Sequence, residues 1–137
     1  MYIKKILEYS YNYASYIVTD GKNEIKCVCA SVPLPNEQIP KVGLEISNVF
    51  AVKCDGLRIK KIFDKKGNKD CIKKFTPWSM KYKLRGRVSS LKQSIIDVFG
   101  FKISLEYDYP DGLNGMIEQG DVVEFFVDWL ECEIKDC

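Results

Sequence analysis

The residues best suited to chemistry in this sequence form a basic and aromatic run between Lys73 and Arg87. The run holds six lysines or arginines and three aromatic residues, and it contains no carboxylate. Cationic grooves that follow a phosphate backbone, with flat side chains on which bases stack, are typical of proteins that bind single-stranded nucleic acid. The run therefore favours such a partner, held by salt-sensitive phosphate contacts. We expect the binding residues to be Lys73, Lys74, Trp78, Lys81, Lys83, Arg85 and Arg87.

The three aromatic residues of this run are expected to differ in their roles. Pro77 favours a loop or an edge conformation around Trp78, and an exposed Trp78 would stack on a base. Phe75 could be either buried or exposed. Tyr82 shares the phase of the apolar residues in its strand, so packing in the core is its expected role.

Charge is unevenly distributed along the chain, although the formal net charge is only +2. Residues 53–92 hold fourteen basic and three acidic side chains, whereas residues 93–137 hold two basic and eleven acidic ones. One interpretation is that the two blocks neutralise each other across neighbouring strands. The other is that part of the basic block faces solvent and binds an anionic partner.

The spacing of residues 80–88 predicts a strand whose even positions face the core and whose odd positions carry cations. If this strand turns through residues 89–94 and pairs with its successor so that Tyr82 and Phe101 share a face, the cations lie opposite uncharged residues. Neutralisation would then have to come from residues 122–134, and without it we expect an exposed positive ridge. The expected pairs are Arg87 with Ile96, Arg85 with Val98 and Lys83 with Gly100.

The acidic end of the chain indicates a second class of function. A predicted strand over residues 122–134 carries several carboxylates, which could complement a basic protein and speed its association. An inhibitor or immunity-type module would use such a surface. The alternative is that these acids serve only solubility. The residues expected to meet a protein partner are Glu124, Asp128, Glu131 and Glu133.

Catalysis is the least favoured class of function. The chain contains no histidine, which removes the commonest acid–base residue and every Ser/His or Cys/His pair. Residues 89–92 match the S-x-x-K pattern of serine acyl enzymes, but they lie in a short polar connection without the companion motifs. No glycine-rich phosphate loop is present. We therefore expect a non-catalytic binding module that needs no cofactor.

The six cysteines are expected to be reduced thiols that pack in the core or lie at the surface. Cys27 and Cys29 are two residues apart, which places them on one face of a strand. A thiolate metal site is the alternative, but the chain has no C-x-x-C pair and no histidine ligand. Plain packing is therefore the favoured role, and no metal is expected.

Alternation of apolar and polar residues with a period of two predicts a mostly β fold with antiparallel strands. Over residues 101–109 the odd positions are apolar or aromatic and the even positions are polar. Asp20 and Gly21 supply the backbone angles of a tight hairpin between two further strands. At most one short helix is expected, in the loops around residues 34–42, 89–94 or 112–118.

Two stretches of the chain, residues 21–46 and 100–123, share an order of features. In each, a glycine precedes an alternating strand, a proline ends it, a loop of about ten residues follows, and a glycine starts the next strand. This pattern indicates two related strand–loop–strand units. They would pack best as one closed or partly open small barrel, which leaves few exposed strand edges.

Residues 117–125 carry a resemblance to a known class of fold. Their sequence, Ile-Glu-Gln-Gly-Asp-Val-Val-Glu-Phe, resembles the glycine–aspartate turn that leads into a strand in many small β-barrels. The layout of short strands and long loops is similar to that of OB-like barrels. The resemblance implies a fold and carries no activity with it.

The length of 137 residues predicts a single domain over residues 1–137 with a real hydrophobic core. No stretch approaches the roughly 18 apolar residues of a membrane span. The first residues lack the apolar run of a secretory signal. These features favour a soluble cytoplasmic protein with no membrane partner.

Overall fold

The computed structural model describes residues 1–10, 13–29, 41–52, 60–61, 70–74, 80–113 and 117–135. Within these ranges the chain forms strands and turns and no helix, which confirms the mostly β prediction. The strands are β1 (Tyr2–Ser10), β2 (Tyr13–Thr19), β3 (Glu24–Cys29), β4 (Ile46–Val52), β5 (Lys60–Lys61), β6 (Cys71–Lys74), β7 (Tyr82–Ser90), β8 (Ile95–Val98), β9 (Phe101–Ser104), β10 (Val122–Val127) and β11 (Trp129–Ile134).

The strands belong to one sheet with the order β1-β2-β3-β11-β4-β9-β8-β7-β10-β5, and β6 pairs with β7 beside this path. The path starts at β1 and ends at β5, so strand pairing does not close it into a single barrel. The expectation of purely antiparallel pairing is wrong at two places. Strands β3 and β11 are parallel, and so are β4 and β9. Both parallel pairs join segments that are distant in sequence, where no hairpin fixes the direction.

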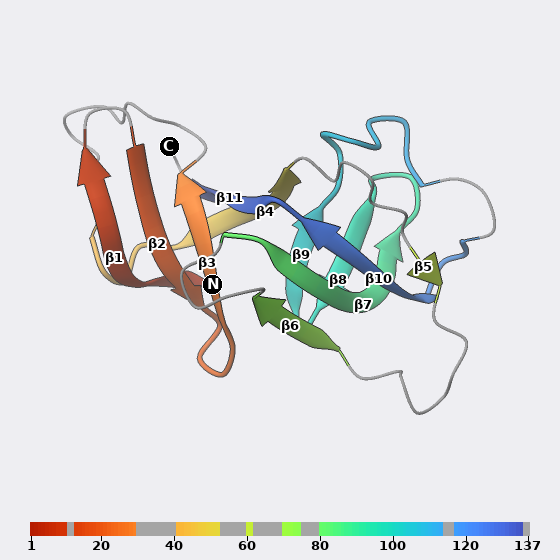
Figure 1. Cartoon of the computed structure of the whole chain (residues 1–137), viewed down its shortest axis with the longest axis horizontal. Coiled ribbons are helices and arrows are strands. Elements are labelled where there is room, and N and C mark those ends of the chain that lie inside the picture. The colour runs from red at the N-terminus through yellow and green to blue at the C-terminus, as the bar shows by residue number, and fades with distance from the viewer. Residues whose placement is uncertain are drawn as a thin grey trace.

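The sheet is divided between two lobes (Figure 1). Strands β1, β2 and β3 lie at one end of the molecule, and β7, β8 and β9 lie at the other, while β4 and β11 run between them. The two connecting strands are antiparallel to each other along most of their length. The buried apolar residues of both lobes form one contiguous core. The connecting strands therefore fix the position of one lobe relative to the other.

Strand β7 shows the alternation that the sequence predicts. Tyr82, Leu84 and Val88 are buried in the core, and the cationic positions between them face outward. Gly86 shares the inward phase, and a Cβ atom at this position would lie 2.1 Å from the backbone oxygen of Asp97 on β8. A glycine is therefore required for β7 and β8 to approach this closely.

The two related units predicted from the sequence have matching backbone contacts. The amide of Gly43 donates to the oxygen of Ile3 at 2.8 Å, and the amide of Ile3 donates to the oxygen of the residue after Gly43 at 2.9 Å. Gly120 and Val88 repeat both bonds in the other lobe, at 3.0 and 2.9 Å. Both glycines have positive φ, +96° and +83°, a conformation that side chains disfavour. The turns that precede β4 and β10 therefore have the same backbone bonds and the same glycine conformation.

The cysteines of the described ranges are free thiols. Cys27, Cys29 and Cys132 are buried in the core, and Cys71 on β6 is half-buried. Cys27 and Cys29 share one face of β3, as their spacing predicts. Cys54 and Cys137 lie outside the described residues. No helix of the described ranges is long and apolar enough to cross a membrane.

Candidate interaction surfaces

The cations of β7 meet an acidic residue of the last strands. Arg85 lies directly opposite Glu124 across the β7–β10 pair, and its Nε and Nη2 atoms donate to Glu124 Oε2 at 3.1 and 2.5 Å. Lys83 Nζ lies 3.6 Å from Glu124 Oε1. Burial raises the pKa of Glu124, but the hydrogen bond from Arg85 and the charge of Lys83 outweigh this and hold the pKa below its usual value. Glu124 thus neutralises part of the expected positive ridge.

The expected register between β7 and β8 is wrong by one residue. Arg87 lies opposite Asp97, and Val88 lies opposite Ile96. A shift in the pairing between Val88 and Ser90 produces the difference, because it adds a residue to β7 before the turn. The nearest strand therefore does offer an acid. Its carboxylate accepts from Lys102 Nζ at 2.7 Å and is thus already paired.

The other residues of the basic run are only partly brought together. Lys73 on β6 lies directly opposite Lys83 on β7. Lys74 Nζ lies 5.9 Å from the centre of the Tyr82 ring, and burial, followed by the charge of Lys26, lowers the pKa of Lys74. Lys81 is exposed and directly precedes β7. Trp78 and its neighbour Phe75, the expected stacking residues, lie outside the described residues.

The four acidic residues expected to meet a protein partner do not form one group. Glu124 faces the cations of β7, and Asp128 separates β10 from β11. Glu131 and Glu133 share the outward face of β11, beside Phe50 and Asn48 of β4 respectively. In the described part of the chain, neither Glu131 nor Glu133 makes an ion pair. These two carboxylates share one face and could together meet a partner's cations.

Aromatic side chains hold the carboxylate of Glu131 in place. The Tyr107 hydroxyl donates to Glu131 Oε2 at 3.2 Å, and the indole Nε1 of Trp129 donates to Oε1 at 3.4 Å. The rings of Phe50 and Tyr107 stack with their centres 5.3 Å apart and their planes at 28°. These three rings come from β4, β11 and the turn after β9. We refer to Phe50, Tyr107, Trp129, Glu131 and Glu133 as the aromatic-acidic surface.

The sequence does not reveal the aromatic half of this surface. The alternation over residues 101–109 predicts that Tyr107 faces the core, but β9 ends at Ser104 and Tyr107 is 50% exposed. The amides of Asp108 and Tyr109 both bond to the oxygen of Leu105, so the chain turns there instead of continuing as a strand. Burial and then the charge of Glu131 raise the pKa of Tyr107. The phenol therefore stays protonated and able to donate.

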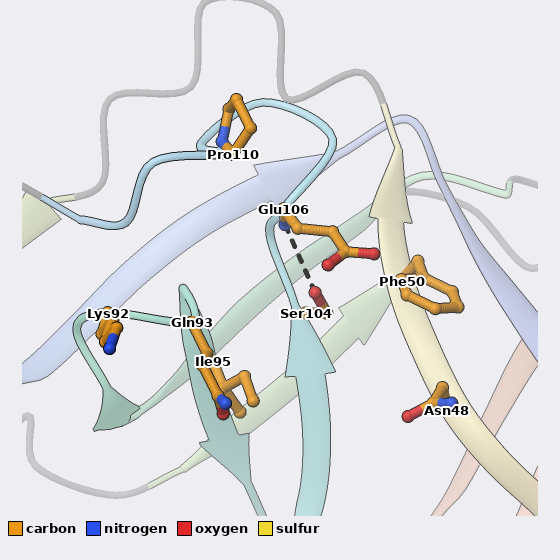
Figure 2. A pocket seen from close by; sticks show the side chains of 8 residues that line it. All are labelled: Asn48, Phe50, Lys92, Gln93, Ile95, Ser104, Glu106 and Pro110. Carbon is orange, nitrogen blue, oxygen red and sulfur yellow. Dashed lines mark hydrogen bonds between the residues drawn. The ribbon is translucent and has the colours of Figure 1, made fainter.

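A hollow of about 440 Å³ lies next to the aromatic-acidic surface (Figure 2). It is lined by Asn48, Phe50, Lys92, Gln93, Ile95, Ser104, Glu106 and Pro110. Phe50 belongs both to the hollow and to the aromatic-acidic surface. The amide of Glu106 donates to Ser104 Oγ at 3.3 Å, and Figure 2 shows its carboxylate pointing toward the side of the hollow where Phe50 lies.

Comparison with known proteins adds no assignment to this geometry. No protein-family model, curated protein or solved structure matches the chain. Within the described ranges, no group of three or more Cys, Asp or Glu side chains is placed to hold a metal ion. The chemistry of the aromatic-acidic surface is therefore the basis for a functional assignment.

Proposed function

We propose that this protein is a non-catalytic interaction module whose aromatic-acidic surface receives a basic segment of another protein. The observation that carries the proposal is the carboxylate of Glu131, held from both sides by Tyr107 and Trp129 while it makes no ion pair among the described residues. A carboxylate has about four acceptor sites, and two donors leave room for a guanidinium or an ammonium group. A partner's arginine or lysine completes this arrangement.

The rings of the aromatic-acidic surface favour the same occupant. A cation over the face of an aromatic ring gains roughly 0.5–2 kcal/mol. Tyr107 and Trp129 both bond to Glu131, and Phe50 lies directly opposite it on β4. Tyrosine and tryptophan are also the residues most enriched at the centres of protein interfaces. Glu133 adds a second negative charge on the same face of β11, which speeds the approach of a basic partner.

A peptide titration tests this proposal. Replacing Trp78 with phenylalanine leaves Trp129 as the only tryptophan of the chain, so its fluorescence reports on the surface directly. We expect a glycine-flanked arginine peptide to change this fluorescence, and Glu131→Gln to weaken its binding about tenfold, roughly 1.4 kcal/mol. Glu45→Gln is the matched control, because Glu45 is an exposed acid paired with Lys135. Equal effects of the two variants, or no response to the peptide, would overturn the proposal.

A second candidate function is the binding of single-stranded nucleic acid near β6. Lys73 lies opposite Lys83, and like charges directly opposite are destabilising, so a phosphate between them would relieve the repulsion. Affinity for a labelled oligonucleotide should fall steeply with added salt and fall further in Trp78→Ala or Lys73→Ala. The absence of binding at low salt would exclude this function. The pairing of Lys83 and Arg85 with Glu124 makes it the weaker of the two candidates.

We infer that each lobe approaches a small barrel of the OB-like kind. Support comes from the backbone bonds between Ile3 and the Gly43 turn, and from the bridge between Tyr2 and Glu45, which bring β1 beside the start of β4. The bonds between Val88 and Gly120 do the same for β7 and β10. Amide hydrogen exchange tests the inference. The amides of Ile3 and Val88 should be protected to a similar degree, whereas rapid exchange at Ile3 would indicate an open first lobe.

A further inference from the structure

The hollow in Figure 2 continues the aromatic-acidic surface across neighbouring strands. Ser104 on β9 lies opposite Phe50 on β4, and Phe50 lies opposite Glu131 on β11. The three positions therefore form a row perpendicular to the strands. The Phe50 ring stacks on Tyr107 and also lines the hollow. A ligand seated at Glu131 would reach the hollow by passing this pair of rings.

The end of the hollow nearest Phe50 carries a second carboxylate, that of Glu106. Glu106 makes no ion pair within the described part of the chain. Its charge, like that of Glu131, contributes to the raised pKa of Tyr107, although burial contributes most. Glu131, which accepts from Tyr107, and Glu106, which lines the hollow with Phe50, are thus two carboxylates near the Phe50–Tyr107 stack without an ion pair among the described residues. Each could receive one basic side chain.

The rest of the lining suits the backbone of an extended peptide. Asn48, Gln93 and Ser104 offer amide and hydroxyl groups, which can both donate and accept hydrogen bonds. Such groups bind peptide N–H and C=O groups whatever the side chains are. Lys92 lies across the hollow from Phe50 in Figure 2, where a peptide carbonyl could accept from its ammonium group. Lys92, the one cation among the described residues of the lining, thus lies away from the carboxylate of Glu106.

We propose that the hollow is a second cation subsite and that the partner's segment is dibasic. One basic side chain pairs with Glu131 and the other with Glu106, with the stacked rings of Phe50 and Tyr107 between them. This inference rests on the function proposed above. From Glu131 to Ser104 in the lining of the hollow, two steps between neighbouring strands span about 10 Å, and an extended or polyproline-like chain covers about 3.1–3.4 Å per residue. The two basic residues are therefore separated by about two others.

Two synthetic peptides test the inference. The first carries two arginines separated by two glycines, and the second carries glutamine in place of the second arginine. We expect the dibasic peptide to bind the unaltered chain about tenfold more tightly than the monobasic one. Glu106→Gln should abolish this advantage, and the monobasic peptide should still bind at Glu131. Glu8→Gln, which alters an exposed acid on β1, is the matched control and should preserve the advantage.

The possible results separate this inference from the proposed function. Equal affinity of the two peptides for the unaltered chain would overturn the second subsite and leave the Glu131 site standing. An advantage that survives Glu106→Gln would also overturn it, because the second arginine would then bind elsewhere. If neither peptide binds, the proposed function fails and the second subsite fails with it. Because Glu106 is exposed in a turn, its replacement should not disturb folding.

Discussion

Glu124 lies directly opposite Arg85, and the two side chains are joined by hydrogen bonds to a single carboxylate oxygen. The most basic and the most acidic parts of the chain therefore meet across β7 and β10. Some of the basic and acidic residues in the two oppositely charged blocks of the sequence therefore neutralise each other within the fold. Glu131 and Glu133 on β11 and Glu106 in the turn after β9 make no such ion pair among the described residues, so they are the acids considered for binding a partner.

Removing the carboxylate of Glu124 should destabilise the fold. In Glu124→Gln, Arg85 and Lys83 lose their acidic partner while they remain partly buried, so we expect a loss of about 1–3 kcal/mol in the free energy of unfolding. Chemical denaturation measures this change. Glu45→Gln breaks an exposed pair with Lys135 and should cost about 0–1 kcal/mol. A loss no larger in Glu124→Gln than in this control would contradict the prediction.

The same pair makes stability depend on acid pH. The pKa of Glu124 is lowered in the folded state, so its contribution is fully present above the ordinary value of 4.5 and is lost as pH falls through the lower folded pKa. The unaltered chain should therefore lose more stability than Glu124→Gln between pH 5 and the folded pKa. Denaturation curves at several pH values compare the two chains, and parallel pH profiles would argue against the pairing.

Close approach of two backbones should make Gly86 intolerant of any side chain. A Cβ atom there would lie 2.1 Å from the oxygen of Asp97, so Gly86→Ala must push β7 and β8 apart, at a cost of at least about 2 kcal/mol. Gly120→Ala is a useful comparison, because nothing lies within 4 Å of its Cβ position and only its φ of +83° opposes the change. We expect about 1–2 kcal/mol there. Thermal unfolding should show a larger loss of stability in Gly86→Ala than in Gly120→Ala.

Sequence periodicity predicts those properties that depend on one strand alone. Every second side chain of a strand points to the same face, so the inward and outward faces of β7 follow from residues 80–88 without knowledge of the partners. The packing of Cys27 and Cys29 on one face of β3 follows in the same way. Gly43 and Gly120 recur at matching places in the sequence, and both have positive φ in the structure.

Pairing between strands depends on backbone details that the sequence does not display. The shift between Val88 and Ser90 changes the residue opposite Arg87, and no local signal marks it. The turn at Leu105 interrupts an alternation that continues through Tyr109 in the sequence. The parallel contacts of β3 with β11 and of β4 with β9 join remote segments. The aromatic-acidic surface combines residues from β4, β11 and the turn after β9. These segments are remote in sequence, so the sequence alone does not display the surface.

Tyr82 should link the two lobes through its hydroxyl group. Its oxygen accepts from the amide of Lys26 on β3 at 2.7 Å, although the ring belongs to β7. Tyr82→Phe leaves this amide without its acceptor, so we expect a loss of about 1–2 kcal/mol in the free energy of unfolding. Tyr2→Phe, which alters an exposed ring on β1, should change stability by less than about 0.5 kcal/mol. Equal losses in the two variants would show that the hydrogen bond from Lys26 does not contribute to stability.

The same hydroxyl makes stability depend on alkaline pH. Burial raises the pKa of Tyr82 to about 12, from an ordinary value of 10.0. Its neutral form therefore stabilises the fold fully below pH 10, and this contribution is lost as pH rises toward 12. Tyr82→Phe should consequently lose less stability than the unaltered chain over this range. Denaturation at pH 9, 10 and 11 would show this. The same dependence of the free energy of unfolding on pH in the two chains would count against a buried phenol.

The phenol of Tyr107 should report the charge of Glu131. Burial, followed by the charge of Glu131 and their hydrogen bond, raises the pKa of Tyr107. Glu131→Gln removes the charge while keeping the size of the side chain, so the pKa of Tyr107 should fall. Absorbance titration of the phenolate measures this, and Tyr107→Phe identifies the signal by its loss. A basic peptide bound at Glu131 should lower the pKa in the same direction, because its cation offsets the carboxylate. An unchanged titration in the presence of saturating peptide would place the peptide elsewhere on the molecule.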